Sequence, residues 1–195
     1  MRSARLQQFI GALTAAFDAA ELPAQARSAA DRVFAAAARP GAPGTPVGEV
    51  LPVTQGLGAA LAPLLPRKDA LGDLARALAD LAPDLVWTTR KAIGPTASDG
   101  FAQAHANCFL LGPNAMESRD DLWVGISLMA PGTRYPDHDH APEEVYLVLS
   151  PGEFWHGDAA WVSPGVGGTV HNVPGIRHAM RAGDAPFLAI WVLPV

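Results

Sequence analysis

The sequence predicts an α+β protein, in which an N-terminal helical region is followed by an antiparallel β-barrel of the jelly-roll type. Two observations support this class. Apolar residues recur with helical spacing up to residue 84 and with a period of two afterwards. The second part also contains many short apolar runs separated by Pro-Gly turns, with no helical pattern between them. We therefore expect helices over residues 1–84, packed on a barrel over residues 85–195.

The predicted helices follow from apolar residues at the i, i+3, i+4 and i+7 positions of one helix face. Proline and glycine mark their limits. Pro23 separates the first two helices, and three prolines and three glycines predict a loop over Arg39–Gly48. The expected helical segments are Leu6–Ala20, Ala26–Ala37, Thr54–Leu65 and Leu71–Leu81.

The predicted strands are short and regularly spaced. In Leu122–Ala130, apolar residues at every second position predict one face against a core. Turns such as Ala130-Pro131-Gly132 and Ser150-Pro151-Gly152 end several of these runs. The other expected strands are Asn107–Leu111, Thr133–His138, Glu144–Leu149, Glu153–Trp155, Trp161–Val162, Gly168–Val173, His178–Arg181 and Phe187–Leu193.

The composition limits the partners. The 195 residues are 49% hydrophobic and 17% charged, with a net charge of −5 and no basic run, so we expect a globular protein without a nucleic-acid or membrane partner. We also expect no signal peptide and no transmembrane helix. Cys108 is the single cysteine, which excludes an internal disulfide and favours a cytoplasmic location. A homodimer stays open.

A cluster of histidines predicts a metal site. His138 and His140 lie two apart, so on a strand both side chains share a face. Glu144 opens the next predicted strand after a short turn, and His178 comes from a later strand. Imidazole and carboxylate ligands suit one divalent transition metal ion, namely Zn, Fe, Mn, Co or Ni. We expect these four residues to hold it, with Glu143 and His171 as alternatives.

The same residues resemble the first motif of the cupin superfamily, whose fold is a double-stranded β-helix jelly roll. Gly132, His138, His140 and Glu144 match that motif element by element, and the closing Gly152 falls one residue late. The second motif matches less fully. Gly175 and His178 fit its Gly-x-x-His core. The proline of the motif falls at Pro174, one place too close to Gly175, and Ala182 replaces the asparagine of the motif.

A closer resemblance is to the cupin-type dimethylsulfoniopropionate (DMSP) lyases. It rests on the run RYPDHDHAPEEVYLVL over Arg134–Leu149 and on PGIRHA over Pro174–Ala179. The resemblance implies a metal-dependent carbon–sulfur lyase that releases dimethyl sulfide and acrylate from a small-molecule substrate by β-elimination. It implies His138, His140, Glu144 and His178 as metal ligands and Tyr146 as the catalytic base.

The two tyrosines of the chain flank the ligands. Tyr146 lies two residues after Glu144 and therefore shares its face. A nearby dication lowers the pKa of a phenol, which favours Tyr146 as a catalytic base. Without the resemblance, a tyrosine that is only packed in the core explains this position equally well. Tyr135 lies three residues before His138, so strand parity turns it away unless Pro136 bends the chain. We expect it to contact substrate or assist proton transfer.

The substrate's sulfonium group predicts an aromatic wall, because aromatic faces attract cations. We expect this wall to include Trp123, Trp155 and Trp161, with Trp191 and Phe154 as further candidates. Arg134 and Arg177 adjoin ligands but should point outward. Two other functions stay open. One is a different cupin metalloenzyme, such as a dioxygenase, isomerase or decarboxylase, and the other is a non-catalytic module that binds a metal or small ligand.

Overall fold

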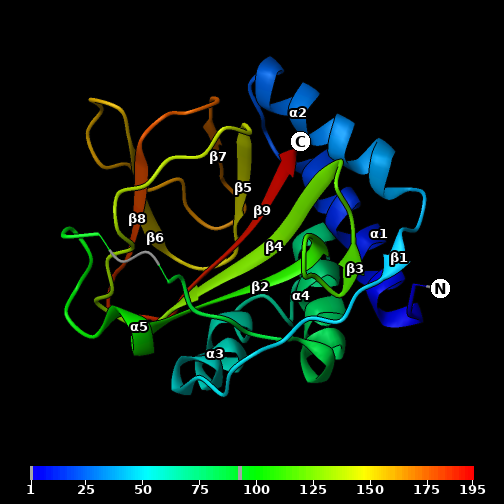
Figure 1. Cartoon of the computed structure of the whole chain (residues 1–195), viewed down its shortest axis with the longest axis horizontal. Coiled ribbons are helices and arrows are strands. Elements are labelled where there is room, and N and C mark those ends of the chain that lie inside the picture. The colour runs from blue at the N-terminus through cyan, green and yellow to red at the C-terminus, as the bar shows by residue number, and fades with distance from the viewer. Residues whose placement is uncertain (1, 92–93) are drawn as a thin grey trace.

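The computed structural model describes residues 2–91 and 94–195. It places most helices on one side of a large β-sheet and a small two-stranded sheet on the other side (Figure 1). The class predicted from the sequence, helices followed by a jelly-roll-like β region, is confirmed. The helices are α1 (Ala4–Ala19), α2 (Ala24–Ala37), α3 (Leu57–Leu61), α4 (Ala70–Leu81) and α5 (Phe101–Ala104), with 3-10 turns at Pro52–Gly56 and Ala82–Asp84.

Local sequence explains most helix limits. Ser3 caps α1 by accepting a hydrogen bond from the amide of Leu6, and Asp69 caps α4 in the same way. The predicted helix over Thr54–Leu65 is shorter than expected: a 3-10 turn precedes the five-residue α3. Gly56 and Gly58 lie within this segment and weaken a continuous α-helix.

The large sheet has the strand order β1-β3-β2-β4-β9-β5-β7, and only the β2–β3 pair is parallel. A separate sheet contains the antiparallel pair β6 and β8. The short strands β1 and β3 were not predicted. The strands are β1 (Ala42–Pro43), β2 (His105–Gly112), β3 (Glu117–Ser118), β4 (Leu122–Met129), β5 (Glu144–Val148), β6 (Gly152–His156), β7 (Thr169–Asn172), β8 (His178–Ala182) and β9 (Phe187–Pro194).

Alternation along the central strands divides the interior into two apolar clusters. On β4, Val124, Ile126 and Leu128 pack with the helices in one cluster. Met129 belongs to the other, on the opposite face of the sheet, and Trp123 packs against it. The side chains of a strand alternate between faces, so one sequence supplies both the helix-facing core and the wall of a cavity. The helix-facing cluster is continuous from α1 to β9.

The two sheets meet around the segment from Arg134 to His138. The predicted strand Thr133–His138 is wrong as a regular strand, because only Arg134 and His138 form isolated bridges, to Arg181 and His178. Pro136 lies between them and lacks the amide proton that a continuous ladder requires. The predicted strand Trp161–Val162 likewise reduces to a bridge from Val162 to Phe154.

No helix in the described part of the chain combines the length and apolar character that a membrane span requires.

Candidate metal centre and cavity

Three histidines converge where the two sheets meet. His138 and His140 lie on the segment before β5, and His178 begins β8. His138 pairs with His178 across an antiparallel bridge, and their ring centroids are 4.1 Å apart. Potential ligand nitrogens of all three histidines lie within 4.8 Å of one another. This spacing suits coordination of a single ion.

Each of these histidines is oriented by its own backbone. The Nδ1 atoms of His138, His140 and His178 lie 2.9, 2.8 and 2.9 Å from the carbonyl oxygens of Pro136, Pro142 and Ile176. A carbonyl oxygen only accepts, so Nδ1 donates in each case and Nε2 is the atom that faces the centre of the cluster. Metal-bound histidines are commonly held in this way, because the second hydrogen bond fixes both the tautomer and the ring plane.

Glu144 completes the constellation from the start of β5. Its Oε2 atom lies 3.3 Å from His140 Nε2 and 3.2 Å from His178 Nε2. The His178 contact lacks hydrogen-bond geometry, which leaves this buried nitrogen without a hydrogen-bond partner. An unsatisfied buried nitrogen is costly, and a metal ion at the centre of the cluster would satisfy it. The four residues therefore fit a divalent transition metal ion.

The charge states suit the same purpose. Burial and the neighbouring His178 lower the pKa of His138 to about 3, so its imidazole is neutral at physiological pH. Burial opposes ionisation of Glu144, but His140 and His178 outweigh it and lower the carboxyl pKa to about 2. A neutral imidazole and an ionised carboxylate are the forms that bind metal. Burial lowers the pKa of His140, but its contact with the Glu144 carboxylate outweighs burial and raises it, so metal binding would displace a proton from His140.

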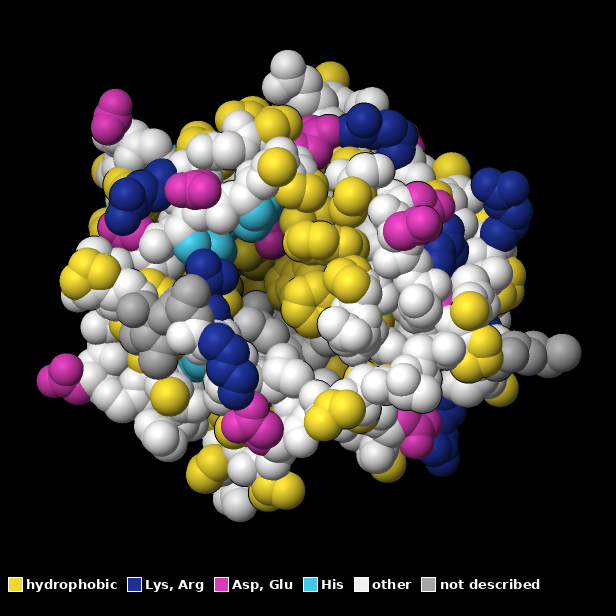
Figure 2. Space-filling model, viewed as in Figure 1, with side chains coloured by type: hydrophobic (Ala, Val, Ile, Leu, Met, Phe, Trp, Pro, Cys, Tyr) yellow, Lys and Arg dark blue, Asp and Glu magenta, His cyan; other side chains and the backbone are white. Residues whose placement is uncertain are grey.

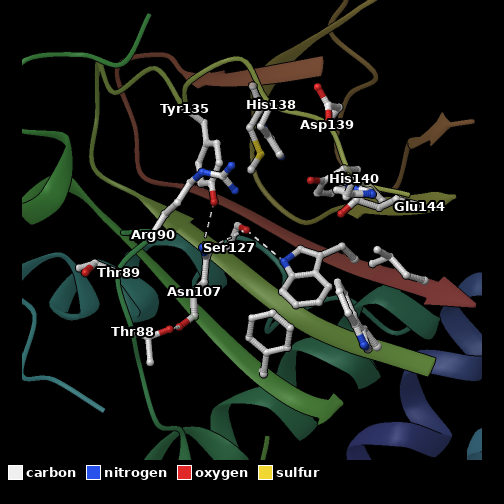
Figure 3. Close-up of a pocket in the computed structure, with 16 residues that line it drawn as sticks. Thr88, Thr89, Arg90, Asn107, Ser127, Tyr135, His138, Asp139, His140 and Glu144 are labelled. Atoms are coloured by element: carbon white, nitrogen blue, oxygen red, sulfur yellow. Dashed lines mark hydrogen bonds and ion pairs between the residues drawn. The ribbon is translucent and has the colours of Figure 1, made fainter. Parts of the chain in front are cut away.

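The metal cluster opens into a cavity of about 270 Å³. In Figure 2 this hollow is lined largely by hydrophobic side chains, with histidines along its edge. Figure 3 shows His138, His140 and Glu144 at one end and Arg90, Thr88 and Thr89 at the other. The complete lining is Thr88, Thr89, Arg90, Asn107, Phe109, Trp123, Ser127, Tyr135, His138, Asp139, His140, Glu144, Tyr146, Met180, Trp191 and Leu193.

Tyr146 lies in the wall of this cavity, on the same face of β5 as Glu144. It is only 2% exposed. Burial and the charge of Glu144 raise the pKa of Tyr146 well above its usual value when no metal is bound. A cation held by the ligands would act in the opposite direction. The proton affinity of Tyr146 would therefore depend on whether a metal ion is bound.

Tyr135 also faces the cavity, which agrees with the expected bend at Pro136 and not with the parity of a regular strand. Its ring lies 5.0 Å from that of His138, and Asn107 donates a 3.0 Å hydrogen bond to its hydroxyl. Pro136 interrupts the strand between Tyr135 and His138, which lets both side chains point inward. Burial raises the pKa of Tyr135, while Asn107 and Arg90 oppose that rise.

Only part of the expected aromatic wall lies at the cavity. Trp123 and Trp191 line it together with Phe109, whose ring is 4.8 Å from Trp191. Trp155 and Trp161 are not among the lining residues. They pair with each other, and Trp161 stacks under the guanidinium groups of Arg181 and Arg134 at 4.3 and 5.5 Å. The alternation of residues along β6 did not show from the sequence whether Trp155 faces the cavity.

The alternative ligands lie outside the cluster. His171 contacts Glu143 at 3.1 Å, and Glu143 also pairs with Arg32 of α2. Arg134 and Arg177 face Asp137 rather than the cavity, as expected. The Nε2 atom of His105 accepts a hydrogen bond from the amide of Arg90, so His105 is not a ligand.

Several polar residues at the site were not singled out from the sequence. Asn107, Ser127 and Arg90 line the cavity. Asn172 lies directly opposite Glu144 in the sheet and donates a 3.2 Å hydrogen bond to its carboxylate. Polar residues at alternate positions of otherwise apolar strands are the signal that identifies Asn107 and Ser127.

A jelly-roll-like β region with three clustered histidines and one glutamate beside an inner cavity is typical of a cupin-type fold with a candidate metal site. Comparison with known families then makes the assignment specific. The model of the DMSP lyase family matches residues 25–189, and the chain belongs to that family.

Individual relatives agree with this assignment. A Cereibacter sphaeroides protein assigned as the DMSP lyase DddL is 36% identical over 136 residues, which is 70% of this chain. The chain spans only 56% of that relative's length. DMSP lyase DddQ from Ruegeria pomeroyi DSS-3 shares 21% identity and a TM-score of 0.69, over 100% of this chain and 93% of its own.

A second solved structure, reported with the DMSP lyases RdDddP and RnDddQII, has a TM-score of 0.71 at 23% identity. The match covers 98% of this chain and 93% of the other. At these identities the two structures show that the fold is shared along the whole chain.

Proposed function

We propose that this protein is a metal-dependent DMSP lyase, which cleaves the carbon–sulfur bond by β-elimination to give dimethyl sulfide and acrylate. One observation carries the proposal. Tyr146 shares a strand face with Glu144 in a cavity that joins a three-histidine cluster to an aromatic wall. Such a cavity offers opposite surroundings for the two ends of DMSP, a carboxylate and a sulfonium cation.

The carboxylate end belongs beside His138, His140, Glu144 and His178. A divalent ion held there would polarise the substrate carboxylate and oppose the negative charge that develops next to it as the α-proton leaves. Tyr146 and Tyr135 face the same region of the cavity. Tyr146 and Tyr135 are thus the two phenols near the position proposed for the reacting carbon. The other ionisable side chain on β5 is Glu144.

Tyr146 acts as the base in this scheme. Its phenolate oxygen accepts the α-proton, and the electron pair of that C–H bond forms the double bond of acrylate. The carbon–sulfur bond breaks, and its electrons leave with neutral dimethyl sulfide. No redox step is involved. Burial and Glu144 raise the pKa of Tyr146, so this role needs the lowering that a metal ion held by the ligands would supply.

Trp123, Trp191 and Phe109 provide the sulfonium end of the cavity. Trp191 is 6% exposed and packs edge to face with Phe109 at an interplanar angle of 73°. Electron-rich aromatic faces attract a methylated cation without requiring a counter-charge. The neutral sulfide formed by elimination no longer benefits from this attraction, which favours its release.

The decisive experiment measures dimethyl sulfide in the headspace above purified protein loaded separately with Zn, Fe, Mn, Co or Ni. Tyr146→Phe should lower the rate about 10²- to 10⁴-fold, the usual contribution of a general base, while the metal content stays equal to wild type. Full activity in this variant would refute the assignment of the base. No dimethyl sulfide with any of these metals would refute the lyase.

A matched pair of aromatic variants tests the cavity wall. Trp191→Leu removes an aromatic face of the cavity and should raise KM for DMSP by roughly 10-fold, about 1–2 kcal/mol of cation–π attraction. Trp155→Phe alters a residue outside the cavity and should leave KM unchanged. An equal effect of both substitutions would show that the wall is placed wrongly.

The ion and the location belong to the same proposal. The ligand set does not discriminate among Zn, Fe, Mn, Co and Ni, so metal analysis of the protein as isolated from its own cells identifies the native ion.

A cytoplasmic location is supported by the single cysteine, which is buried and unpaired by any disulfide. Detection of the protein in a cell fraction other than the cytosol would contradict it.

A further inference from the structure

Three polar side chains form a continuous hydrogen-bond chain across the floor of the cavity and end at Tyr135 (Figure 3). Trp191 Nε1 lies 3.1 Å from Ser127 Oγ, which lies 2.8 Å from Asn107 Oδ1. Asn107 Nδ2 lies 3.0 Å from the Tyr135 hydroxyl. These residues come from β9, β4 and β2 and from the loop before the metal ligands.

The direction of this chain follows from its indole donor and from the orientation of the Asn107 amide. An indole N–H only donates, so Ser127 Oγ accepts from Trp191. Ser127 then donates its single proton to the oxygen of Asn107, which turns the NH₂ group of that amide toward Tyr135. Because an NH₂ group cannot accept, the hydroxyl of Tyr135 must be the acceptor. Its own proton therefore points away from Asn107.

Sheet register builds the chain. Asn107 and Ser127 are directly paired on β2 and β4, so their side chains lie together on the cavity face. Trp191 is paired with Gly125, two residues from Ser127. A Cβ atom at Gly125 would lie 2.2 Å from the Trp191 ring, so the indole lies across the strand only because that position is glycine. The indole N–H thereby reaches Ser127.

We infer that Asn107 and Ser127 are positioning residues of the lyase, which hold the Tyr135 hydroxyl with its proton directed into the cavity beside the metal ligands. The inference rests on the proposed function and extends it. In this arrangement Tyr135 is a hydrogen-bond donor to the substrate carboxylate or to the charge that forms on it. Tyr146 keeps the separate role of base.

The surroundings of Tyr135 support this role. Its ring packs edge to face against Phe101 at 5.1 Å and against His105 at 5.6 Å, which fixes the plane of the phenol. The guanidinium carbon of Arg90 lies 5.8 Å from the ring centroid. Arg90 and the NH₂ group of Asn107 both present donors to this side of Tyr135, and neither group can accept the hydroxyl proton.

The first test observes the hydroxyl itself and needs no activity. The chain has only two tyrosines, so Tyr146→Phe leaves Tyr135 as the single tyrosine for ultraviolet resonance Raman spectroscopy. The intensity ratio of the tyrosine doublet distinguishes a hydroxyl that accepts from one that donates. With Asn107 present, the ratio should be that of an acceptor. Adding Asn107→Asp, which replaces NH₂ by a carboxylate of the same shape, should convert it to a strong donor.

The second test measures catalysis and metal binding in otherwise wild-type protein. Asn107→Asp and Ser127→Ala should each lower kcat for dimethyl sulfide release roughly 10- to 100-fold, the cost of misplacing a reacting group. Metal stoichiometry and affinity, measured by titration calorimetry with Zn²⁺, should stay at wild-type values. Ser127→Thr retains the hydroxyl and should restore kcat.

The outcomes separate this inference from the proposed function. An unchanged Raman ratio on Asn107→Asp overturns the direction of the chain, whether or not the protein is a lyase. Wild-type kcat in both Asn107→Asp and Ser127→Ala, or loss of metal affinity in both, shows a merely structural network and overturns the positioning role. If one variant fails to fold by near-ultraviolet circular dichroism, the other decides. Failure of wild-type protein to release dimethyl sulfide overturns the lyase assignment alone.

Discussion

The Nε2 atom of His178 lies 3.2 Å from Oε2 of Glu144 and makes no hydrogen bond, although His178 is only 3% exposed. The pair brings together the first residue of β5 and the first residue of β8, from different sheets. A buried ring nitrogen without a hydrogen-bond partner is costly, and a cation held between this nitrogen and the carboxylate would satisfy both groups. The folded protein should therefore gain stability when a metal ion binds.

Metal binding should raise the melting temperature. Stabilisation reaches about 2.7 kcal/mol when the free metal is 100 times its dissociation constant. His178→Ala should remove this response, whereas His171→Ala, which changes a histidine outside the cluster, should keep it. Differential scanning calorimetry with and without chelator gives the comparison. A full response in the His178 variant would exclude His178 as a ligand.

Acid should destabilise the metal-free protein in a defined window. The folded state holds the pKa of His138 at about 3 and that of Glu144 at about 2, below the usual values of about 6.5 and 4.3. At these two residues the unfolded chain therefore binds more protons between these limits, so their contribution to stability is full above about pH 6.5 and is lost toward pH 2. Urea unfolding across this range measures the loss.

The variant His138→Gln tests how much His138 contributes to this pH dependence of stability. His138→Gln cannot titrate, so the decline of stability between about pH 6.5 and 4.3 should flatten, while the steeper decline below it remains. An unchanged slope in the upper part of the window would show that His138 is not the group that titrates there.

Arg2 should stabilise the fold through a buried ion pair. Its guanidinium binds both oxygens of Glu117 at 2.7 and 2.8 Å, and each side chain is 2% exposed. Arg2→Ala should cost about 3–5 kcal/mol in the free energy of unfolding, because it leaves a buried carboxylate with weaker partners. Arg5, paired with Asp84 at the surface, is the control: Arg5→Ala should cost about 1 kcal/mol or less. Similar losses in the two variants would contradict this reading.

Gly125→Ala should disturb the cavity rather than the strand. The added methyl group would meet the Trp191 ring at 2.2 Å, so the indole must move and its hydrogen bond to Ser127 must break. We expect a lower kcat and a higher KM for DMSP. Gly11→Ala, within α1 and with nothing within 4 Å, should instead stabilise by about 0.5–1 kcal/mol. Activity assays on both variants, together with thermal unfolding, check the contrast.

Much of the fold was predictable because the signals are local. The helix periods, the caps and the alternation on β4 are each contained in a few consecutive residues, and the observed elements follow them closely. The short strands β1 and β3 escaped prediction because two-residue pairings carry no periodic pattern. The segment before the metal site was misread as a strand because Pro136 breaks a ladder whose residue types otherwise suit one.

The sequence by itself determined the chemistry available at this site. The spacing within the pair His138 and His140, and within the pair Glu144 and Tyr146, predicts from side-chain period that each pair shares a face. Only the tertiary structure decided which distant residues join them. It set His178 opposite His138, turned Tyr135 inward, selected Trp191 over Trp155 for the cavity and linked Asn107 to Ser127. These choices depend on strand register and on bends between strands, which arise from packing across the whole molecule rather than from neighbours in the chain.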